Sequence, residues 1–193
     1  MQEILKVLPQ LIKPGTSLQQ SEDNWKAIVE SFFDINVVDD YNLACICATV
    51  KVETASTFAP IKEYGNRNYF TRMYWTNVRT RKQLGNLTQA DAYTFYGRGY
   101  IQLTGRNNYL KVSEDLKIPD LLQNPDIACE PLIAGKVLAW YWEKHGLVGL
   151  CEQLKTAKPD YYPAMLMEIR RRVNGGLNGL GEFLSTLKIL GLD

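Results

Sequence analysis

The sequence has little of what marks several common classes of protein. It contains one histidine, His145, and four cysteines. The cysteines stand at Cys45, Cys47, Cys129 and Cys151, and this spacing fits no zinc site. We therefore expect no metal and no other cofactor. Buried free thiols are the default state for these cysteines, and a bridge between Cys129 and Cys151 is left open.

Long apolar runs are also missing. No stretch of 18 apolar residues occurs, so we expect no membrane span. Residues 1–15 predict a helix and not a signal peptide, because Glu3, Lys6 and Lys13 interrupt the apolar positions and no small-residue cleavage site follows. A protein of this kind would be made in the cytoplasm, and something else would have to carry it out.

A strong excess of one charge is absent as well. The chain has 22 Lys and Arg against 21 Asp and Glu, a net charge of +1, which argues against a nucleic-acid partner. The charges are nevertheless unevenly spread. Residues 1–40 hold three Lys and seven acidic residues, whereas residues 62–106 hold eight Lys and Arg against Glu63 and Asp91. This basic stretch fits either an anionic or polar polymer as partner or a solvated face.

The length and the apolar pattern predict a single, mainly helical domain over residues 1–193. A chain of this length with 46% hydrophobic residues can form one core, divided by a cleft. Residues 41–54 are apolar nearly all round, which indicates a central, buried helix ending near Glu53. Further helices are predicted over residues 1–13, from a cap at Ser21 to residue 33, and over 107–117, 132–145, 161–173 (capped by Asp160) and 182–190.

Between these helices lies a long segment without clear periodicity. Residues 55–105 are rich in Gly, Asn, Arg, Tyr and Thr. A compact domain keeps such a long connection only where it builds a site or a small sheet. We expect irregular loops there, with a short β-hairpin within Tyr69–Thr76.

Two glutamates are candidates for acid and base chemistry. Hydrolysis of a glycosidic bond needs a protonated carboxylic acid for the leaving oxygen and a carboxylate that activates water or attacks the sugar. Glu53 suits the acid, because apolar surroundings and the negative end of its helix both favour the neutral form. Glu63 lies in a wetter loop and would stay ionised as the base. From spacing alone, both could equally be surface residues.

The stretch FYGRGYIQLTG, residues 95–105, is the most distinctive motif. It lacks the Gly-Lys-Ser/Thr of a phosphate loop and the third glycine of a dinucleotide fingerprint. In an extended piece, Gln102 and Thr104 would point to one side. Their amide and hydroxyl groups suit sugar hydroxyls, N-acetyl groups or a bound water.

Four segments in this order resemble glycoside hydrolase family 19, most of all its lysozyme-like members among phage endolysins and related cell-wall hydrolases. They are ATVKVET ending after Glu53, FYGRGYIQLTGRNNY over 95–109, NPDIACEP over 124–131 and RRVNGG over 171–176. The resemblance covers about residues 43–190. It implies a mainly α, lysozyme-like α+β fold with two helical lobes around a cleft.

The resemblance also implies roles for individual residues. Glu53 matches the general acid and Glu63 the general base, although the loop between the two acids varies in length across the family. Thr104 matches a residue that holds the attacking water. The expected substrate contacts are Tyr96, Gln102, Asn108, Arg171 and Asn174. In the run from Arg170 to Arg172, we expect a solvated face with one arginine turned inward toward the carboxylates.

These expectations lead to an inverting hydrolase of β-1,4 bonds between N-acetylmuramic acid and N-acetylglucosamine in peptidoglycan, acting as a monomer. It would reach the cell wall through a membrane lesion or as an injected effector. A chitinase is the alternative, weakened because Gly105 and Arg106 replace the tryptophan that follows the Gln-Leu-Ser/Thr element in plant chitinases. The alternative of another class is a glycan-binding module without catalysis.

Overall fold

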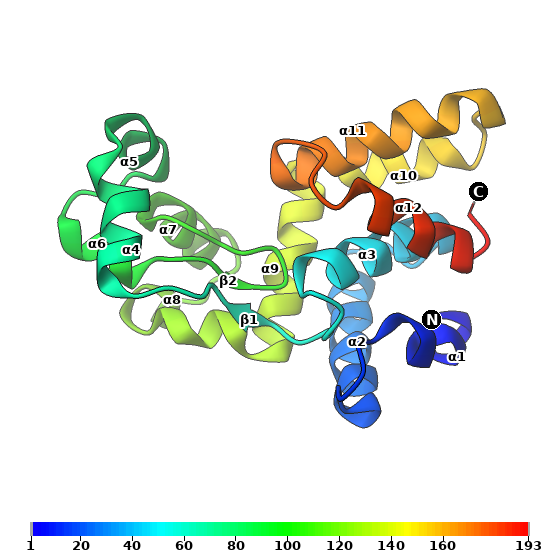
Figure 1. The fold of residues 1–193 in the computed structure, drawn as a ribbon, viewed down its shortest axis with the longest axis horizontal. Helices are drawn as coiled ribbons and strands as arrows, with labels where there is room; N and C mark the ends of the chain where they lie inside the picture. Colours follow the sequence, from blue (N-terminus) through cyan, green and yellow to red (C-terminus); the bar gives the residue numbers. More distant parts are fainter. Residues whose placement is uncertain (1, 193) are drawn as a thin grey trace.

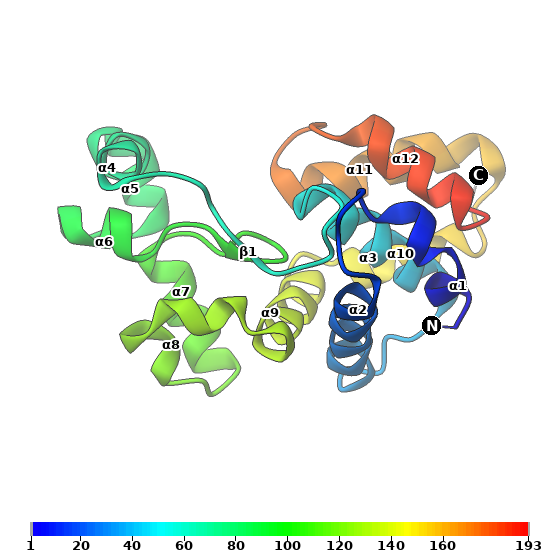
Figure 2. The ribbon, with the colours of Figure 1, turned by 60° about the horizontal axis from the view of Figure 1, so that its bottom comes forward.

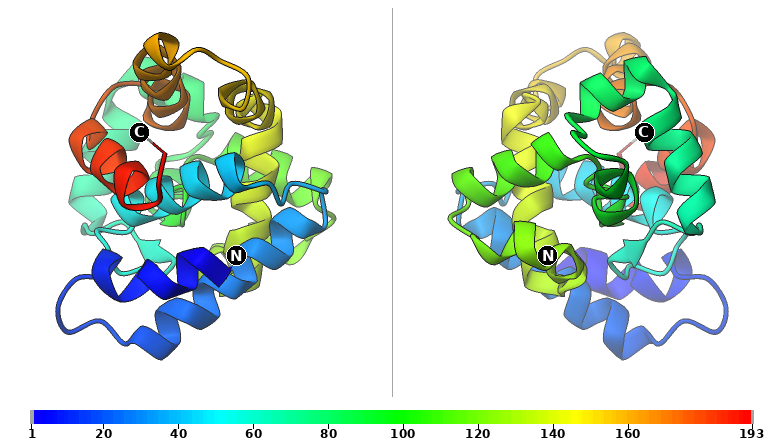
Figure 3. Two further views of the ribbon diagram at one scale, coloured as in Figure 1. Left: turned by 90° about the vertical axis from the view of Figure 1, so that its right-hand side faces the viewer. Right: turned by 90° about the vertical axis from the view of Figure 1, so that its left-hand side faces the viewer.

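The computed structural model describes residues 2–192 and is mainly helical. Figure 1 shows a larger and a smaller lobe with α9 (Pro131–Lys144) between them. The larger lobe contains α1 (Gln2–Leu11), α2 (Leu18–Phe33), α3 (Asp40–Glu53), α10 (Leu147–Leu154), the 3₁₀ turn η3 (Pro159–Tyr161), α11 (Tyr162–Asn174) and α12 (Leu180–Ile189). Both described ends of the chain lie on this lobe (Figure 3).

The smaller lobe is built from the long middle segment and from the residues that connect it to α9. It contains β1 (Ile61–Lys62), α4 (Arg67–Thr71), the π-helix η1 (Arg72–Thr76), α5 (Val78–Leu84), α6 (Gln89–Thr94), β2 (Arg98–Gly99), α7 (Arg106–Asp115), α8 (Asp120–Gln123) and the 3₁₀ helix η2 (Pro125–Cys129). The expectation of irregular loops over residues 55–105 was therefore wrong in part, because several short helices fill this segment.

Each lobe has its own apolar core, and α9 contributes to both. The larger core surrounds α3, whose residues from Asn42 to Val50 are all buried, as the apolar pattern predicted. The smaller core gathers Phe95, Leu103, Tyr109, Val112, Leu121, Ala128 and Val137. Val137 and Leu138 are neighbours on α9, yet the first belongs to the smaller core and the second to the larger. Figure 2 shows α9 between the two lobes.

The sheet consists of two very short antiparallel strands. Ile61 pairs with Gly99 and Lys62 with Arg98, so the sheet joins the two ends of the middle segment. The hairpin expected within residues 69–76 is wrong, because that stretch is helical throughout α4 and η1.

Two helix caps also differ from the prediction. The side chain of Ser17, not of Ser21, caps α2 by accepting a hydrogen bond from Gln20 N. Ser21 lies inside the helix, where its hydroxyl donates to Ser17 O. Asp160 lies within η3, and α11 begins without a side-chain cap. Helices α8 and α10 were not predicted. All four cysteines are free thiols, so the Cys129–Cys151 bridge is not formed.

Candidate active site

Glu53 is the last residue of α3, and its carboxylate faces a buried arginine from α11. Arg170 Nη1 lies 2.7 Å from Glu53 Oε1, and the two side chains are 2% and 17% exposed. The contact lacks the alignment of a directed hydrogen bond, so it is chiefly electrostatic. Arg170 Nε is fixed separately by donating to Asn178 O at 2.7 Å. The apolar surroundings and the helix end that we expected around Glu53 are thus joined by a cation, and this cation is the inward-turned arginine that we expected near the carboxylates.

The turn that follows Glu53 is tightly built. Thr54 is buried, and its hydroxyl donates to Val50 O at 2.7 Å and accepts from Phe58 N at 3.0 Å. Ala55, Ser56 and Phe58 all have positive φ, at 49°, 61° and 52°. Non-glycine residues rarely adopt this left-handed conformation. The chain thus leaves α3 through a strained turn that fixes the position of Glu53.

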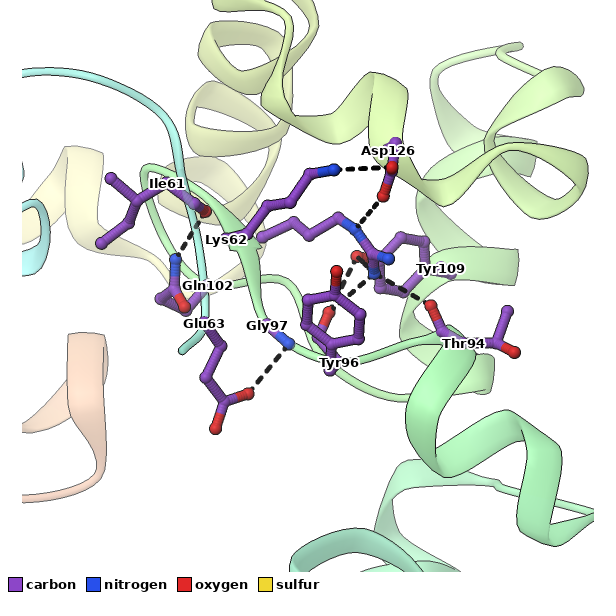
Figure 4. A network of polar contacts seen from close by, with 10 residues as sticks. Ile61, Lys62, Glu63, Thr94, Tyr96, Gly97, Gln102, Tyr109 and Asp126 are labelled. Carbon is purple, nitrogen blue, oxygen red and sulfur yellow. Dashed lines mark hydrogen bonds and ion pairs between the residues drawn. The ribbon is translucent and has the colours of Figure 1, made fainter. Parts of the chain in front are cut away.

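Glu63 directly follows β1 and is held from two sides. Its own N–H donates to Gly97 O at 2.8 Å, while the Gly97 N–H donates to Glu63 Oε2 at 3.1 Å (Figure 4). The Tyr74 hydroxyl lies 2.8 and 2.7 Å from the two carboxylate oxygens. The two donors thus hold the Glu63 carboxylate in one orientation, and Glu63 remains the candidate for the general base.

Tyr74 reaches Glu63 from the π-helix η1. Its ring stacks on Phe70, with the ring centroids 6.2 Å apart and the planes 8° apart. Burial, together with the neighbouring Glu63 carboxylate, raises the pKa of Tyr74 far above its ordinary value, so its hydroxyl keeps its proton. π-Helical turns often occur at functional sites, but nothing in the sequence pattern of residues 72–76 pointed to this contact.

The glycines of the FYGRGYIQLTG motif let backbone and side chains approach closely. A Cβ on Gly97 would lie 2.7 Å from Gln102 Oε1 and 3.2 Å from Glu63 Oε2. Gly99 and Gly105 have φ of 82° and 91°, a conformation that favours glycine. The glycines of the motif are therefore explained by its close packing against Glu63 and Gln102. A phosphate-binding loop is not required to explain them.

The arginine of the motif, Arg98, anchors the smaller lobe. Its Nε donates to Asp126 Oδ1 at 2.9 Å, and Lys62 Nζ lies 2.6 Å from the other oxygen of the same carboxylate. Arg98 Nη1 donates to Thr94 O, Tyr96 O and Tyr109 Oη. These contacts hold β2 in place beneath Glu63.

Gln102, Thr104 and Asn108 form a chain of contacts beside β1. Gln102 has φ of 53°, so the segment turns here and is not the extended piece that we expected. Its amide donates to Ile61 O and Gly99 O. The Thr104 hydroxyl donates to Gln102 O at 2.7 Å, and Asn108 Nδ2 donates to Thr104 O at 2.7 Å. The Thr104 and Asn108 side-chain oxygens remain able to accept hydrogen bonds.

A hollow of about 700 Å³ brings several of the predicted residues together. Its lining includes Gln102, Thr104, Asn108 and Asn174, and it extends to Gln83 and Tyr141. Burial, with the charge of Glu53 as a further cause, raises the pKa of Tyr141, so Glu53 lies within electrostatic range of this wall. Neither Glu53 nor Glu63 lines the hollow itself.

Two of the predicted contact residues are placed differently from the expectation. Phe70 stacks on Tyr96 with centroids 4.4 Å apart, and the Arg98 guanidinium lies 3.8 Å over the same ring. Both faces of Tyr96 are therefore covered, which leaves its edge and hydroxyl for a ligand. Arg171 is exposed, and the arginine turned inward is its neighbour Arg170. The expected solvated face with one inward arginine is confirmed.

Asn174 ends α11 and organises the next loop. Its Nδ2 donates to Asn178 O at 2.9 Å, and its Oδ1 accepts from Gly176 N at 2.9 Å. Both ends of the amide are thus engaged while the residue lines the hollow. Sequence reasoning did not place Tyr74 against Glu63 or Tyr141 at the hollow, and it narrowed the inward arginine only to one of three.

No group of three or more His, Cys, Asp or Glu side chains within residues 2–192 is placed to bind a metal ion. In the same part of the chain, none of the helices has the length and apolar character needed to cross a bilayer.

Comparison with known proteins identifies the family. Residues 33–149 match the glycoside hydrolase family 19 model, described as Chitinase class I. A glycosyl hydrolase family 19 domain-containing protein of Haemophilus influenzae is 30% identical over 102 residues, 51% of this chain and 42% of that protein. Acidic endochitinase Q of Nicotiana tabacum is 46% identical over 55 residues, 28% of this chain and 21% of the enzyme. The matches thus span less than half of these relatives.

The fold agrees with that of solved family members. Chitinase C from Streptomyces griseus aligns with a TM-score of 0.60 and 20% identity, covering 98% of this chain and 75% of the enzyme. A bacterial family 19 chitinase aligns with the same TM-score and 19% identity, covering 100% of this chain and 94% of the other. The mainly helical, lysozyme-like fold is thereby confirmed. Because the family model matches more than half of its length, this chain belongs to glycoside hydrolase family 19.

Proposed function

We propose that the chain hydrolyses β-1,4 bonds between N-acetylmuramic acid and N-acetylglucosamine in peptidoglycan, with inversion at the anomeric carbon. The observation that carries this proposal is the pair of buried or half-buried glutamates, each held by different partners next to a hollow lined with amide and hydroxyl groups. An inverting enzyme needs two carboxyl groups far enough apart, about 6.5–9.5 Å, to admit a water molecule.

In this proposal, Glu53 is the general acid. Arg170 Nη1 contacts Oε1 at 2.7 Å, and we assign the proton for the leaving group to the other oxygen, Oε2. Bound substrate would shield this mostly buried carboxyl group from water. Glu63 is the weaker choice for the acid, because both the Tyr74 hydroxyl and the Gly97 N–H stabilise its charge.

Glu63 would then be the base, and Thr104 would help to orient the water. The Thr104 hydroxyl proton points to Gln102 O, so its oxygen can accept one hydrogen of a water molecule. The other hydrogen would pass to Glu63 as the water oxygen attacks the anomeric carbon. Asn108 Oδ1 is available to accept a hydrogen bond from a sugar hydroxyl or an N-acetyl N–H group.

The two carboxylates are tested by conservative replacement. Glu53→Gln and Glu63→Gln should each lower kcat on purified peptidoglycan by at least about 10²-fold, the usual scale for loss of a general acid or base. Both variants should keep the far-UV circular dichroism spectrum and melting temperature of a folded protein. Near-normal turnover by either folded variant would remove that residue from the mechanism, and a parent protein that binds glycan without cleaving it would be a binding module.

Chitin is the second candidate substrate, because the matching family model and several relatives are described as chitinases. Digesting peptidoglycan and chitin oligomers side by side, with mass spectrometry of the new reducing end, separates the two. A muramic acid end supports our proposal, whereas cleavage of chitin alone favours the alternative. We further propose that the protein acts as a monomer on the cell wall, after a membrane lesion or a secretion system has released it.

A further inference from the structure

The basic stretch of the sequence forms one part of the smaller lobe. Six of its cations form no ion pair with any residue among 2–192: Arg67, Arg72, Arg79, Arg81, Lys82 and Arg106. The two acids of the stretch accept hydrogen bonds from other groups and pair with none of these cations. Glu63 is held by Tyr74 and Gly97, and Asp91 accepts from the N–H groups of Leu87 and Thr88 at the start of α6. The positive charge of these six side chains is therefore not neutralised by ion pairs.

Two of these cations adjoin the hollow on α5. Gln83 and Leu84, at the end of α5, line the hollow. Arg79 lies four residues before Gln83 and therefore on the same side of the helix, and Lys82, three residues after Arg79, is its neighbour on the helix surface. Both side chains are exposed. Arg81 turns elsewhere, because its guanidinium lies 4.5 Å over the ring of Trp75.

A third cation stands at the same hollow on α7. Lys111 is exposed and lies three residues after Asn108, which lines the hollow. Its charge is felt by His145, another lining residue, whose pKa is lowered by burial and further by Lys111 and Arg172. Arg79, Lys82 and Lys111 are here called the cationic rim.

Resting on the proposed function, we infer that the cationic rim binds carboxylate groups of the peptide stems that branch from a peptidoglycan strand seated in the hollow. A chitin strand offers only neutral N-acetyl groups at this place, so it gains nothing from three exposed cations. A peptidoglycan strand carries an acidic peptide on each muramic acid. The rim would thus select an anionic glycan, which the two glutamates alone cannot do.

A nucleic acid is the other polyanion to consider. Its binding would require a much larger unbroken basic surface, whereas the smaller lobe itself carries acids such as Glu114, Asp115 and Asp126. The three cations flank a hollow with amide and hydroxyl walls, which suits a polar glycan with acidic branches.

The test measures binding in proteins that cannot cleave the glycan. All proteins carry Glu53→Gln, and the rim variant adds Arg79→Gln, Lys82→Gln and Lys111→Gln. A remote variant removes the same amount of charge from exposed lysines of the larger lobe that have no ion pair among the described residues, by Lys13→Gln, Lys158→Gln and Lys188→Gln. Binding is measured to intact sacculi, to sacculi stripped of peptide stems by an amidase, and to chitin beads.

We expect the rim variant to bind intact sacculi about 10-fold more weakly at low salt, a loss of about 1.4 kcal/mol. The remote variant should stay within about twofold of its parent. The loss should shrink on stripped sacculi, should be absent on chitin, and should fade at about 0.5 M salt, where exposed charges are screened.

Equal binding of intact sacculi by the rim variant and its parent would overturn this inference and leave the proposed function standing. An equal loss of binding in the remote variant, or an equal loss of binding to chitin by the rim variant, would also overturn it. So would competition in which duplex DNA displaces the protein from sacculi at a lower concentration of negative charge than free peptide stems do. If the Glu53→Gln protein bound no sacculi and the parent cleaved none, the proposed function would fail and this inference with it.

Discussion

Removal of one hydroxyl group, by Tyr74→Phe, should slow catalysis by about 10-fold. The Tyr74 hydroxyl lies within 2.8 Å of both Glu63 oxygens in a half-buried site. A hydrogen bond to a charged group contributes about 1.5–3 kcal/mol. Taking the lower value, loss of the bond that holds the Glu63 carboxylate corresponds to about a tenfold change in rate, since about 1.4 kcal/mol is a factor of ten.

The direction follows from the role proposed for Glu63. A carboxylate that has lost one of its two donors is held less firmly in the orientation that a general base needs, so kcat/KM should fall in Tyr74→Phe. The ring is retained, so the stacking on Phe70 and the melting temperature should change little.

The assay is the measurement of kcat/KM on the preferred glycan at one fixed pH. Tyr69→Phe is the matched control, because Tyr69 also packs edge-on against Phe70, with centroids 5.4 Å apart, but makes no hydrogen bond to Glu63 among the described contacts. An unchanged kcat/KM in Tyr74→Phe, or an equal fall in Tyr69→Phe, would refute the reasoning.

Three further changes test the site. Arg170→Lys should lower activity, and it should lower the free energy of unfolding by about 1–3 kcal/mol because the contact to Asn178 O is lost. In the same chemical denaturation experiment, Arg171→Gln should change the free energy of unfolding by no more than about 0.5 kcal/mol. A larger loss in Arg171→Gln than in Arg170→Lys would show that we chose the wrong arginine. Gly97→Ala should destabilise the protein by about 1–3 kcal/mol and reduce turnover, because the new methyl group meets Gln102 and Glu63. Gly149→Ala, in helix α10 with nothing within 4 Å, should instead be neutral or stabilising, and equal thermal melts for both would contradict the packing argument. Thr104→Ala should reduce kcat less than Glu53→Gln does, while Thr104→Ser should restore most of the rate; a Thr104→Ala enzyme as active as the parent would exclude the residue.

The elements that the sequence predicted best are those with a strong, continuous signal. The all-round apolar pattern of residues 41–54 indicated the buried α3 and placed Glu53 at its end. Pro131 at the first turn of α9 and the glycine after Asn174 marked helix boundaries correctly. That one arginine of residues 170–172 turns inward could be predicted too, because three adjacent helical residues point in different directions, but the sequence did not say which one, and Arg171 was named where Arg170 is the buried residue.

The smaller lobe was hard to predict for a physical reason. Helices α4 and α6, and strands β1 and β2, have between two and six residues each, too few for a period to be recognised. They are held by contacts between distant residues, such as Gly97 with Glu63 and Arg98 with Asp126. The hydrogen bond between Tyr74 and Glu63 is also a contact between different elements. No local sequence pattern could therefore have predicted it.

The strained turn after α3 has a consequence for engineering. Three residues there, Ala55, Ser56 and Phe58, have positive φ, a conformation that disfavours L residues by about 1–2 kcal/mol each. Glycine at Ala55 would relieve part of this strain, yet it would also let the end of α3 fray and give Glu53 more freedom. Screens that select only for heat resistance would therefore favour changes in this turn that impair the enzyme, so thermostable variants should be sought in the helices far from it.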